Sequence, residues 1–173
     1  MPTSLYDLSV ASFLQTLGGV EGFLAKGLTH CKEKGIDPES IVETRLFEDM
    51  LPFRFQVISV AHHSAGAIRG VKAGKFSPSG PTTATYADLQ KMVSDARQEL
   101  EQAKPDEINA LEGKDMIFSV RDITLPFKAE GFLMSFSLPN FHFHATTAYD
   151  ILRMKGVPLG KRDYMGRMRL AKA

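Results

Sequence analysis

The sequence predicts an all-α protein, a four-helix bundle with a small β-hairpin inserted before the last helix. Apolar residues recur at helical spacing in four long segments. Capping and stop residues stand at the ends of these segments. Between residues 115 and 137 the apolar period changes from 3.6 to 2, which is typical of strands. The 173 residues suit one domain, so we expect a single bundle domain over residues 1–173.

The first helix is predicted over residues 5–34. Ser4 stands at its start with Asp7 three residues later, a pattern typical of an N-cap, and Gly35 follows its end. Glycine inside a helix costs about 1 kcal/mol relative to alanine. Either close approach of a neighbouring helix offsets this cost or the helix kinks locally. The glycines concerned are Gly18, Gly19, Gly22 and Gly27.

The second and third helices are separated by a predicted loop. Pro52 opens the second helix, which is expected to end near Gly70 or Gly74. Residues 75–85 carry the proline, glycine, serine and threonine content of a loop. Thr85 then caps a third helix over residues 86–104, with Asp88 at the capping-box position.

The hairpin and the last helix follow. One strand is predicted near residues 116–121, a bend at residues 128–131 and a second strand over residues 132–136. Pro139 suits the first turn of the last helix, and Gly156 with Pro158 ends it. Its core stripe is predicted to comprise Phe141, Ala145, Ala148 and Leu152.

Composition excludes several classes of function. The net charge of +1 provides no basic face for nucleic acid. No basic segment followed by an apolar run opens the sequence, and we identify no apolar stretch of roughly 18 residues. The single cysteine, Cys31, excludes an internal disulfide framework. We therefore expect a cytoplasmic protein that binds neither nucleic acid nor membranes.

The histidines are the remaining candidates for chemistry, because no phosphate loop, dinucleotide fingerprint or paired-cysteine motif occurs. His63 and His144 flank the apolar stripes of the second and last helices and are predicted to converge. His62 is predicted to project away from the core, and the angular step of an α-helix implies that adjacent histidines do not share one site. His142 points away from His144, beside Tyr149. His144 is interpreted as a hydrogen-bonded core histidine, a metal ligand or an acid–base group.

The order of the helices and the last segments resemble the DinB/YfiT-like bundle superfamily, in particular an uncharacterised bacterial branch. The resemblance covers nearly the whole chain, and its most specific part runs from Asn140 to Arg153 and on to Tyr164. Its other segments are residues 52–57 and Arg69-Gly70. It implies an up-down-down-up bundle and a homodimer.

The resemblance also implies a site. Members of the superfamily often carry a metal on three histidines, one from the second helix and two at i, i+4 on the last. Here His144 matches the second of that pair, and His63 or His62 lies near the second-helix ligand. Asn140 stands where the other histidine is expected, and an amide oxygen is a poor partner for zinc or nickel beside imidazole. The implied zinc or nickel site is therefore degenerate.

Two functions stay open on this basis. The first is a non-catalytic or small-ligand-binding dimeric module, whose polar pocket is predicted to include Asn140, His62, His142 and Tyr149. The second is a metal-dependent enzyme, a thiol transferase or a hydrolase, with His63 and His144 as ligands. The identity of the ligand or substrate does not follow from these residues.

Overall fold

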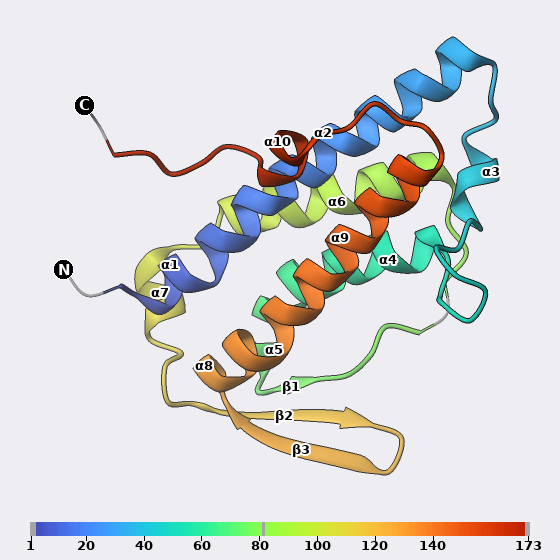
Figure 1. Ribbon diagram of the computed structural model, residues 1–173. Helices are drawn as coiled ribbons and strands as arrows, with labels where there is room; N and C mark the ends of the chain where they lie inside the picture. Colours follow the sequence, from blue (N-terminus) through green and yellow to red (C-terminus); the bar gives the residue numbers. More distant parts are fainter. Residues whose placement is uncertain (1–2, 81, 172–173) are drawn as a thin grey trace.

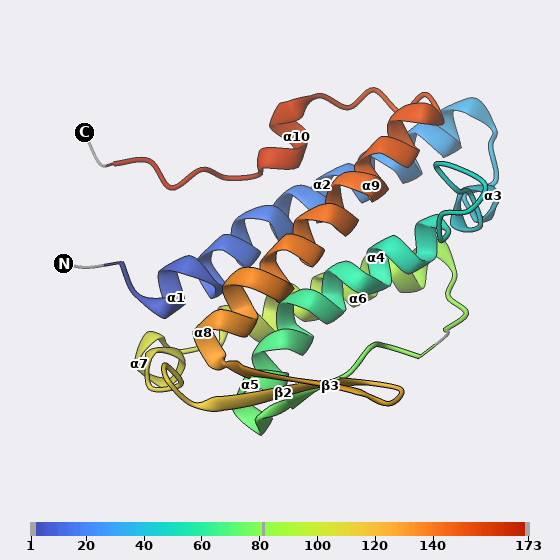
Figure 2. The ribbon, with the colours of Figure 1, turned by 60° about the horizontal axis from the view of Figure 1, so that its bottom comes forward.

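The computed structural model describes residues 3–80 and 82–171 and forms a four-helix bundle with a small sheet at one end (Figure 1). Helices α2 and α9 run in one direction and α4 and α6 in the other, so the predicted up-down-down-up arrangement is confirmed (Figures 1 and 2). In this arrangement α4 packs against α9, and α2 packs against α6. The four long helices are α2 (Val10–Lys34), α4 (Phe53–Ala61), α6 (Tyr86–Glu101) and α9 (Leu138–Met154).

The predicted first helix consists of α1 (Leu5–Leu8) and α2, which meet at Ser9. Ser4 and Asp7 form the expected capping box, and Gly35 ends α2 in the left-handed conformation with φ 65°. Close approach explains two of the glycines. A Cβ on Gly19 would collide with the Tyr164 carbonyl oxygen, and one on Gly27 would collide with the Tyr86 hydroxyl.

The segment Leu5–Lys34 corrects one expectation from the sequence. By length and mean hydropathy alone it could cross a membrane, although we identified no such stretch. Half of the apolar window is buried inside the fold, where α2 packs against α6, α9 and the C-terminal helix α10 (Lys161–Met165). Burial in the bundle accounts for the apolar character of this helix.

The second helical segment contains a π-helical turn. After the short α3 (Glu39–Val42), Pro52 precedes α4, which continues through the π turn η1 (His62–Gly66) into α5 (Ala67–Ala73). Gly74 ends this segment at φ 70°. The third helix, α6, begins with the predicted Thr85–Asp88 capping box, and α7 (Pro105–Asn109) follows it.

The sheet differs from the predicted hairpin. Strand β2 (Asp115–Val120) pairs in antiparallel fashion with β3 (Ile123–Lys128), so the turn lies at residues 121–122 and not at 128–131. Arg121 takes φ 52° in this turn. Glycine, asparagine or aspartate usually occupies such a position, so the arginine did not predict the turn. Part of the predicted loop also forms a strand, β1 (Lys75–Phe76), which pairs in parallel with β2.

The last helical path begins ten residues before Pro139. The segments predicted as the bend and the second strand form α8 (Ala129–Phe132) and the π turn η2 (Leu133–Ser137), which lead directly into α9. Pro139 therefore lies inside a continuous helical path, where it cannot donate a backbone hydrogen bond. A π turn just before a proline relieves the mismatch in the hydrogen-bond ladder.

The core stripe of α9 agrees with the prediction. Phe141, Ala145, Ala148 and Leu152 are all fully buried. Aromatic rings extend the core toward the sheet, where Phe118 on β2 lies against Phe136 with ring centroids 4.6 Å apart. The end of the bundle nearest the sheet therefore has aromatic walls, and His62, His63 and His144 lie there.

Candidate functional site

A cavity of about 280 Å³ lies between η1, η2 and the N-terminal part of α9. Aromatic rings form much of its wall and three histidines reach it. The residues that line it are Phe55, Ser59, His62, His63, Pro78, Ser79, Phe118, Phe136, Asn140 and His144. A small apolar cavity with a few converging polar groups is the usual form of a ligand site.

His63 and His144 lie next to each other in the wall of this cavity. Their ring centroids are 5.8 Å apart and their planes differ by 18°. The ring of Phe55 meets His144 edge-on, with centroids 5.6 Å apart. The structure thus brings together the two histidines that the helical pattern predicted to converge.

Gln56 sets the orientation of His144. The Gln56 side chain donates from Nε2 to the Leu51 carbonyl oxygen at 2.7 Å, so its Oε1 is the acceptor for His144. His144 Nδ1 lies 2.8 Å from that oxygen and donates to it. The proton is then on Nδ1, and Nε2 carries a lone pair. This Nε2 has no partner among the described residues and is not buried, so it is open to the cavity.

His63 is held through its backbone and not through its ring. Its carbonyl oxygen accepts a hydrogen bond of 2.7 Å from the Ser137 hydroxyl, which links η1 to η2. Its ring nitrogen Nδ1 is buried without a partner within residues 3–80 and 82–171. A buried polar atom without a partner is costly and is a common feature of functional sites. The other nitrogen, Nε2, is open to the cavity, as in His144.

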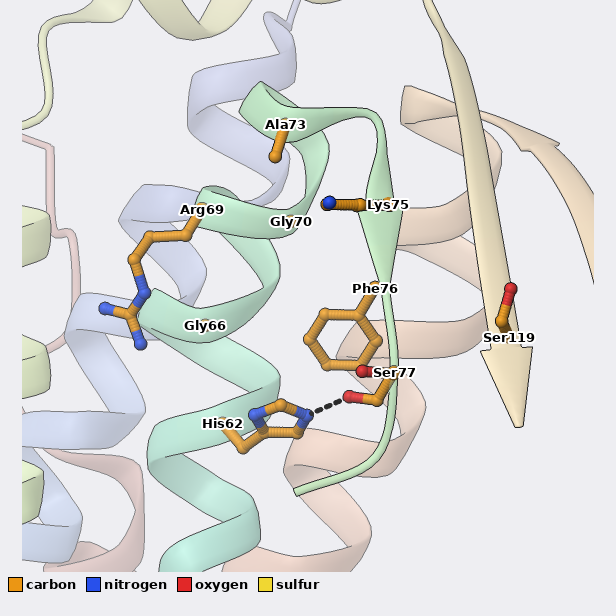
Figure 3. Close-up of a pocket in the computed structure, with 9 residues that line it drawn as sticks. All are labelled: His62, Gly66, Arg69, Gly70, Ala73, Lys75, Phe76, Ser77 and Ser119. Carbon is orange, nitrogen blue, oxygen red and sulfur yellow. Dashed lines mark hydrogen bonds between the residues drawn. The ribbon is translucent and has the colours of Figure 1, made fainter. Parts of the chain in front are cut away.

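The π turn corrects the expectation that adjacent histidines cannot share a site. A π turn places more residues in each turn than an α-helix, so the angle between successive side chains is smaller. The rings of His62 and His63 lie 5.5 Å apart, and both line the cavity. His62 donates from Nε2 to the Ser77 carbonyl oxygen at 2.8 Å, which anchors the segment after β1 (Figure 3).

Burial keeps His63 and His144 neutral. It lowers the pKa of His63 to about 3, with smaller contributions from His62 and His144. Burial also lowers the pKa of His144 to about 4. At pH 7 both rings are therefore uncharged, the form in which imidazole accepts a hydrogen bond or binds a metal.

The donor set does not complete a transition-metal site. Asn140 donates from Nδ2 to the Phe136 carbonyl oxygen at 2.7 Å, so its amide oxygen is the atom that it can offer as a further ligand. No cluster of three His, Cys, Asp or Glu side chains suited to a metal occurs in the described part of the chain. Zinc sites have at least three such protein ligands, so these residues do not fit the metal that the resemblance implies.

The structure places His142 and Tyr149 away from this cavity, although both were predicted for the polar pocket. His142 Nδ1 lies 3.2 Å from the Tyr164 hydroxyl in α10. Tyr149 packs edge-on against Phe23 and Tyr164. Both side chains belong to the contact between α9, α2 and α10, on the other side of the helix.

Cys31 and Gln56 were not among the predicted site residues. Cys31 is fully buried, and burial raises the pKa of its thiol, with a smaller contribution from Asp37. Gln56 was not predicted as a site residue. The signal for it was present, because Gln56, Ser59 and His63 stand at i, i+3 and i+7 and share one face of the helix.

Comparison with known proteins agrees with this fold. The family model described as "Domain of unknown function (DUF1993)" matches residues 5–165. The chain is also similar to the crystal structure of a DinB family member protein from Shewanella denitrificans, with a TM-score of 0.79 and 25% identity. That match covers 98% of this chain and 96% of the other. No curated protein matches. The chain belongs to the DUF1993 family and has a DinB-like fold.

Proposed function

We propose that this protein is a non-catalytic module that binds a small, uncharged aromatic ligand in the cavity lined by His63 and His144. The observation that carries the proposal is the hydrogen bond from His144 to Gln56, which leaves a neutral Nε2 directed at an aromatic-walled cavity. A ligand with a hydroxyl group can donate to this nitrogen while its ring packs against Phe55 and Phe136.

The buried Nδ1 of His63 supports the same class of ligand. A proton on Nδ1 would be buried without an acceptor, whereas a proton on Nε2 is open to the cavity. The favoured tautomer therefore offers a donor at His63 Nε2 together with the acceptor at His144 Nε2. A hydroxyl or amide group, which both donates and accepts, matches this pair.

Phenol and toluene test this proposal, because they have similar shapes and differ in the hydroxyl group. Titrations at pH 7, followed by calorimetry and by the imidazole signals in NMR spectra, should show tighter binding of phenol. Replacing His144 with alanine should weaken phenol binding roughly twofold to tenfold, the range expected for one neutral hydrogen bond.

His142→Ala is the matched control, since it removes a histidine from the same helix on the other side. It should leave phenol affinity unchanged. Equal affinities for phenol and toluene, or an equal loss in both variants, would contradict the proposal.

A metal-dependent enzyme, a thiol transferase or hydrolase, is the second candidate. One observation favours it: the bond from His144 Nδ1 to Gln56 is of the type that orients histidine ligands in metal sites. Metal analysis of protein purified without a histidine tag distinguishes the two candidates. One equivalent of zinc or nickel that is lost in His144→Ala would favour the enzyme over the ligand-binding module.

The homodimer and the cytoplasmic location stay predictions. Sedimentation analysis of the purified chain tests the homodimer directly, and a mass equal to one chain across the micromolar range would contradict it.

A further inference from the structure

A second cavity, of about 530 Å³, lies on the other side of His62 from the histidine pair. Its walls come from η1, α5 and β1, and Ser119 of β2 reaches it as well (Figure 3). Within the described part of the chain, His62 alone lines both cavities. The volume lies within the usual range for small-molecule sites, so a ligand the size of a substituted benzene ring fits it.

The charged side chains at this cavity are all cationic. Arg69 and Lys75 line it, and none of the acidic residues that the structure describes does. Arg69 Nη1 pairs with Glu99 on α6, but an exposed ion pair is weak and a guanidinium has further N–H donors. Lys75 forms no ion pair with any residue that the structure describes. The hydroxyl groups of Ser77 and Ser119 add two neutral donors.

Two glycines keep one wall of the cavity free of side chains. Figure 3 shows Arg69, Lys75 and His62 arranged around Gly66 and Gly70. A Cβ on Gly66 would lie 3.2 Å from the His62 ring and 3.7 Å from Arg69 Nη2, so glycine leaves space beside the guanidinium.

The edges of two stacked rings form another part of the cavity wall. The rings of Phe76 and His62 stack with centroids 4.3 Å apart and planes at 27°. Phe76 is itself almost fully buried and packs closely against Gly70, so its ring is fixed in place. The apolar ring of a ligand can contact the edges of this stack.

We propose that this second cavity binds a small aromatic carboxylic acid, with its carboxylate held by Arg69 and Lys75 and its ring against the edges of the Phe76–His62 stack. A guanidinium matches the planar carboxylate in geometry as well as in charge. Phosphate is less suitable, because it binds best where several backbone N–H groups converge, and the apolar wall gives a free phosphate no partner. This site is distinct from the proposed histidine pocket and does not depend on it.

Benzoate is the probe, and benzamide is its neutral counterpart of the same shape. Titration of the full chain, followed by backbone amide shifts in NMR spectra, should show benzoate binding with the largest shifts at Gly70 and Lys75. Benzamide should bind at least threefold more weakly. The variants Arg69→Gln and Lys75→Gln should each weaken benzoate roughly threefold to tenfold, the cost of one partly exposed charge-assisted hydrogen bond.

Lys72→Gln is the matched control, since Lys72 lies on the same helix, is exposed and does not line the cavity. It should leave benzoate affinity within twofold of the original. An equal loss in Lys72→Gln would show only general surface charge and would overturn the proposal. Equal binding of benzamide, tighter binding of inorganic phosphate, or unchanged binding in both cavity variants would overturn it as well. Amide spectra of each variant verify that the fold is intact.

Discussion

His142 and His144 stand two residues apart on one helix and have different environments. His144 faces the cavity, is 9% exposed and donates to Gln56. His142 faces α10, where its ring meets the hydroxyl of Tyr164. Burial lowers the pKa of both rings, so burial alone does not distinguish a site from a structural contact. The difference is that His144 leaves a nitrogen open to a cavity, whereas His142 contributes to holding the C-terminal segment.

The largest expected effect concerns the helix that carries both histidines. Leu152 on α9 is fully buried, and its side chain lies next to Gly27 of α2. Leu152→Ala should lower the free energy of unfolding by about 2–5 kcal/mol, the usual cost of truncating a buried leucine. Chemical denaturation measures this value, and an unchanged midpoint would show that the core stripe of α9 is misassigned.

Gly19→Ala should disturb the contact between α10 and His142 and leave the surroundings of His144 unchanged. The added methyl group would collide with the backbone of Tyr164 and lie 2.9 Å from the Asp163 carbonyl oxygen. We expect a loss of about 1–3 kcal/mol, as for other overpacked contacts, and a displaced α10. NMR signals of His142 should shift while those of His144 stay in place. Gly18→Ala is the control, because a Cβ there has no atom of the described residues within 4 Å.

Lowering the pH should reduce the stability of the protein mainly through His63 and His144. An unfolded histidine has a pKa near 6.5, whereas those of His63 and His144 are about 3 and about 4 in the folded chain. Between these values the unfolded state binds more protons, so stability falls as the pH falls below about 6.5. The slope is at most about 1.4 kcal/mol per pH unit for each histidine.

Denaturation midpoints between pH 7.5 and pH 4 measure this loss. His63→Gln should reduce the slope more than His142→Gln does, since the pKa of His63 is among the most strongly lowered. Identical slopes in the two variants would remove the proposed distinction between the two faces of the helix.

The smallest expected effect concerns the contact between His142 and Tyr164. Tyr164→Phe removes the hydroxyl that meets His142 and should cost about 0.5–1.5 kcal/mol, the usual value of one hydrogen bond. Phenol binding to the protein should not change. A weaker affinity for phenol would mean that α10 and the cavity are coupled.

Local sequence patterns were sufficient to predict the helices. The caps at Ser4 and Thr85, the stop at Gly35 and the apolar stripe of α9 depend on residues within one or two turns of each other. For the same reason His63 and His144 could be paired in advance: each flanks an apolar stripe, and apolar stripes of a bundle must meet.

Only the tertiary structure decided the details of the site. The π turn η1 is linked to η2 by the bond from Ser137 to the His63 carbonyl oxygen, a contact between residues 74 positions apart in the sequence. The turn at Arg121 and the strand at Lys75 likewise exist because β2 pairs on both of its edges. The tautomer of His144 depends on Gln56, 88 residues away in sequence. Helix formation is a local equilibrium, whereas the direction and protonation of a buried side chain depend on whichever partners packing brings to it.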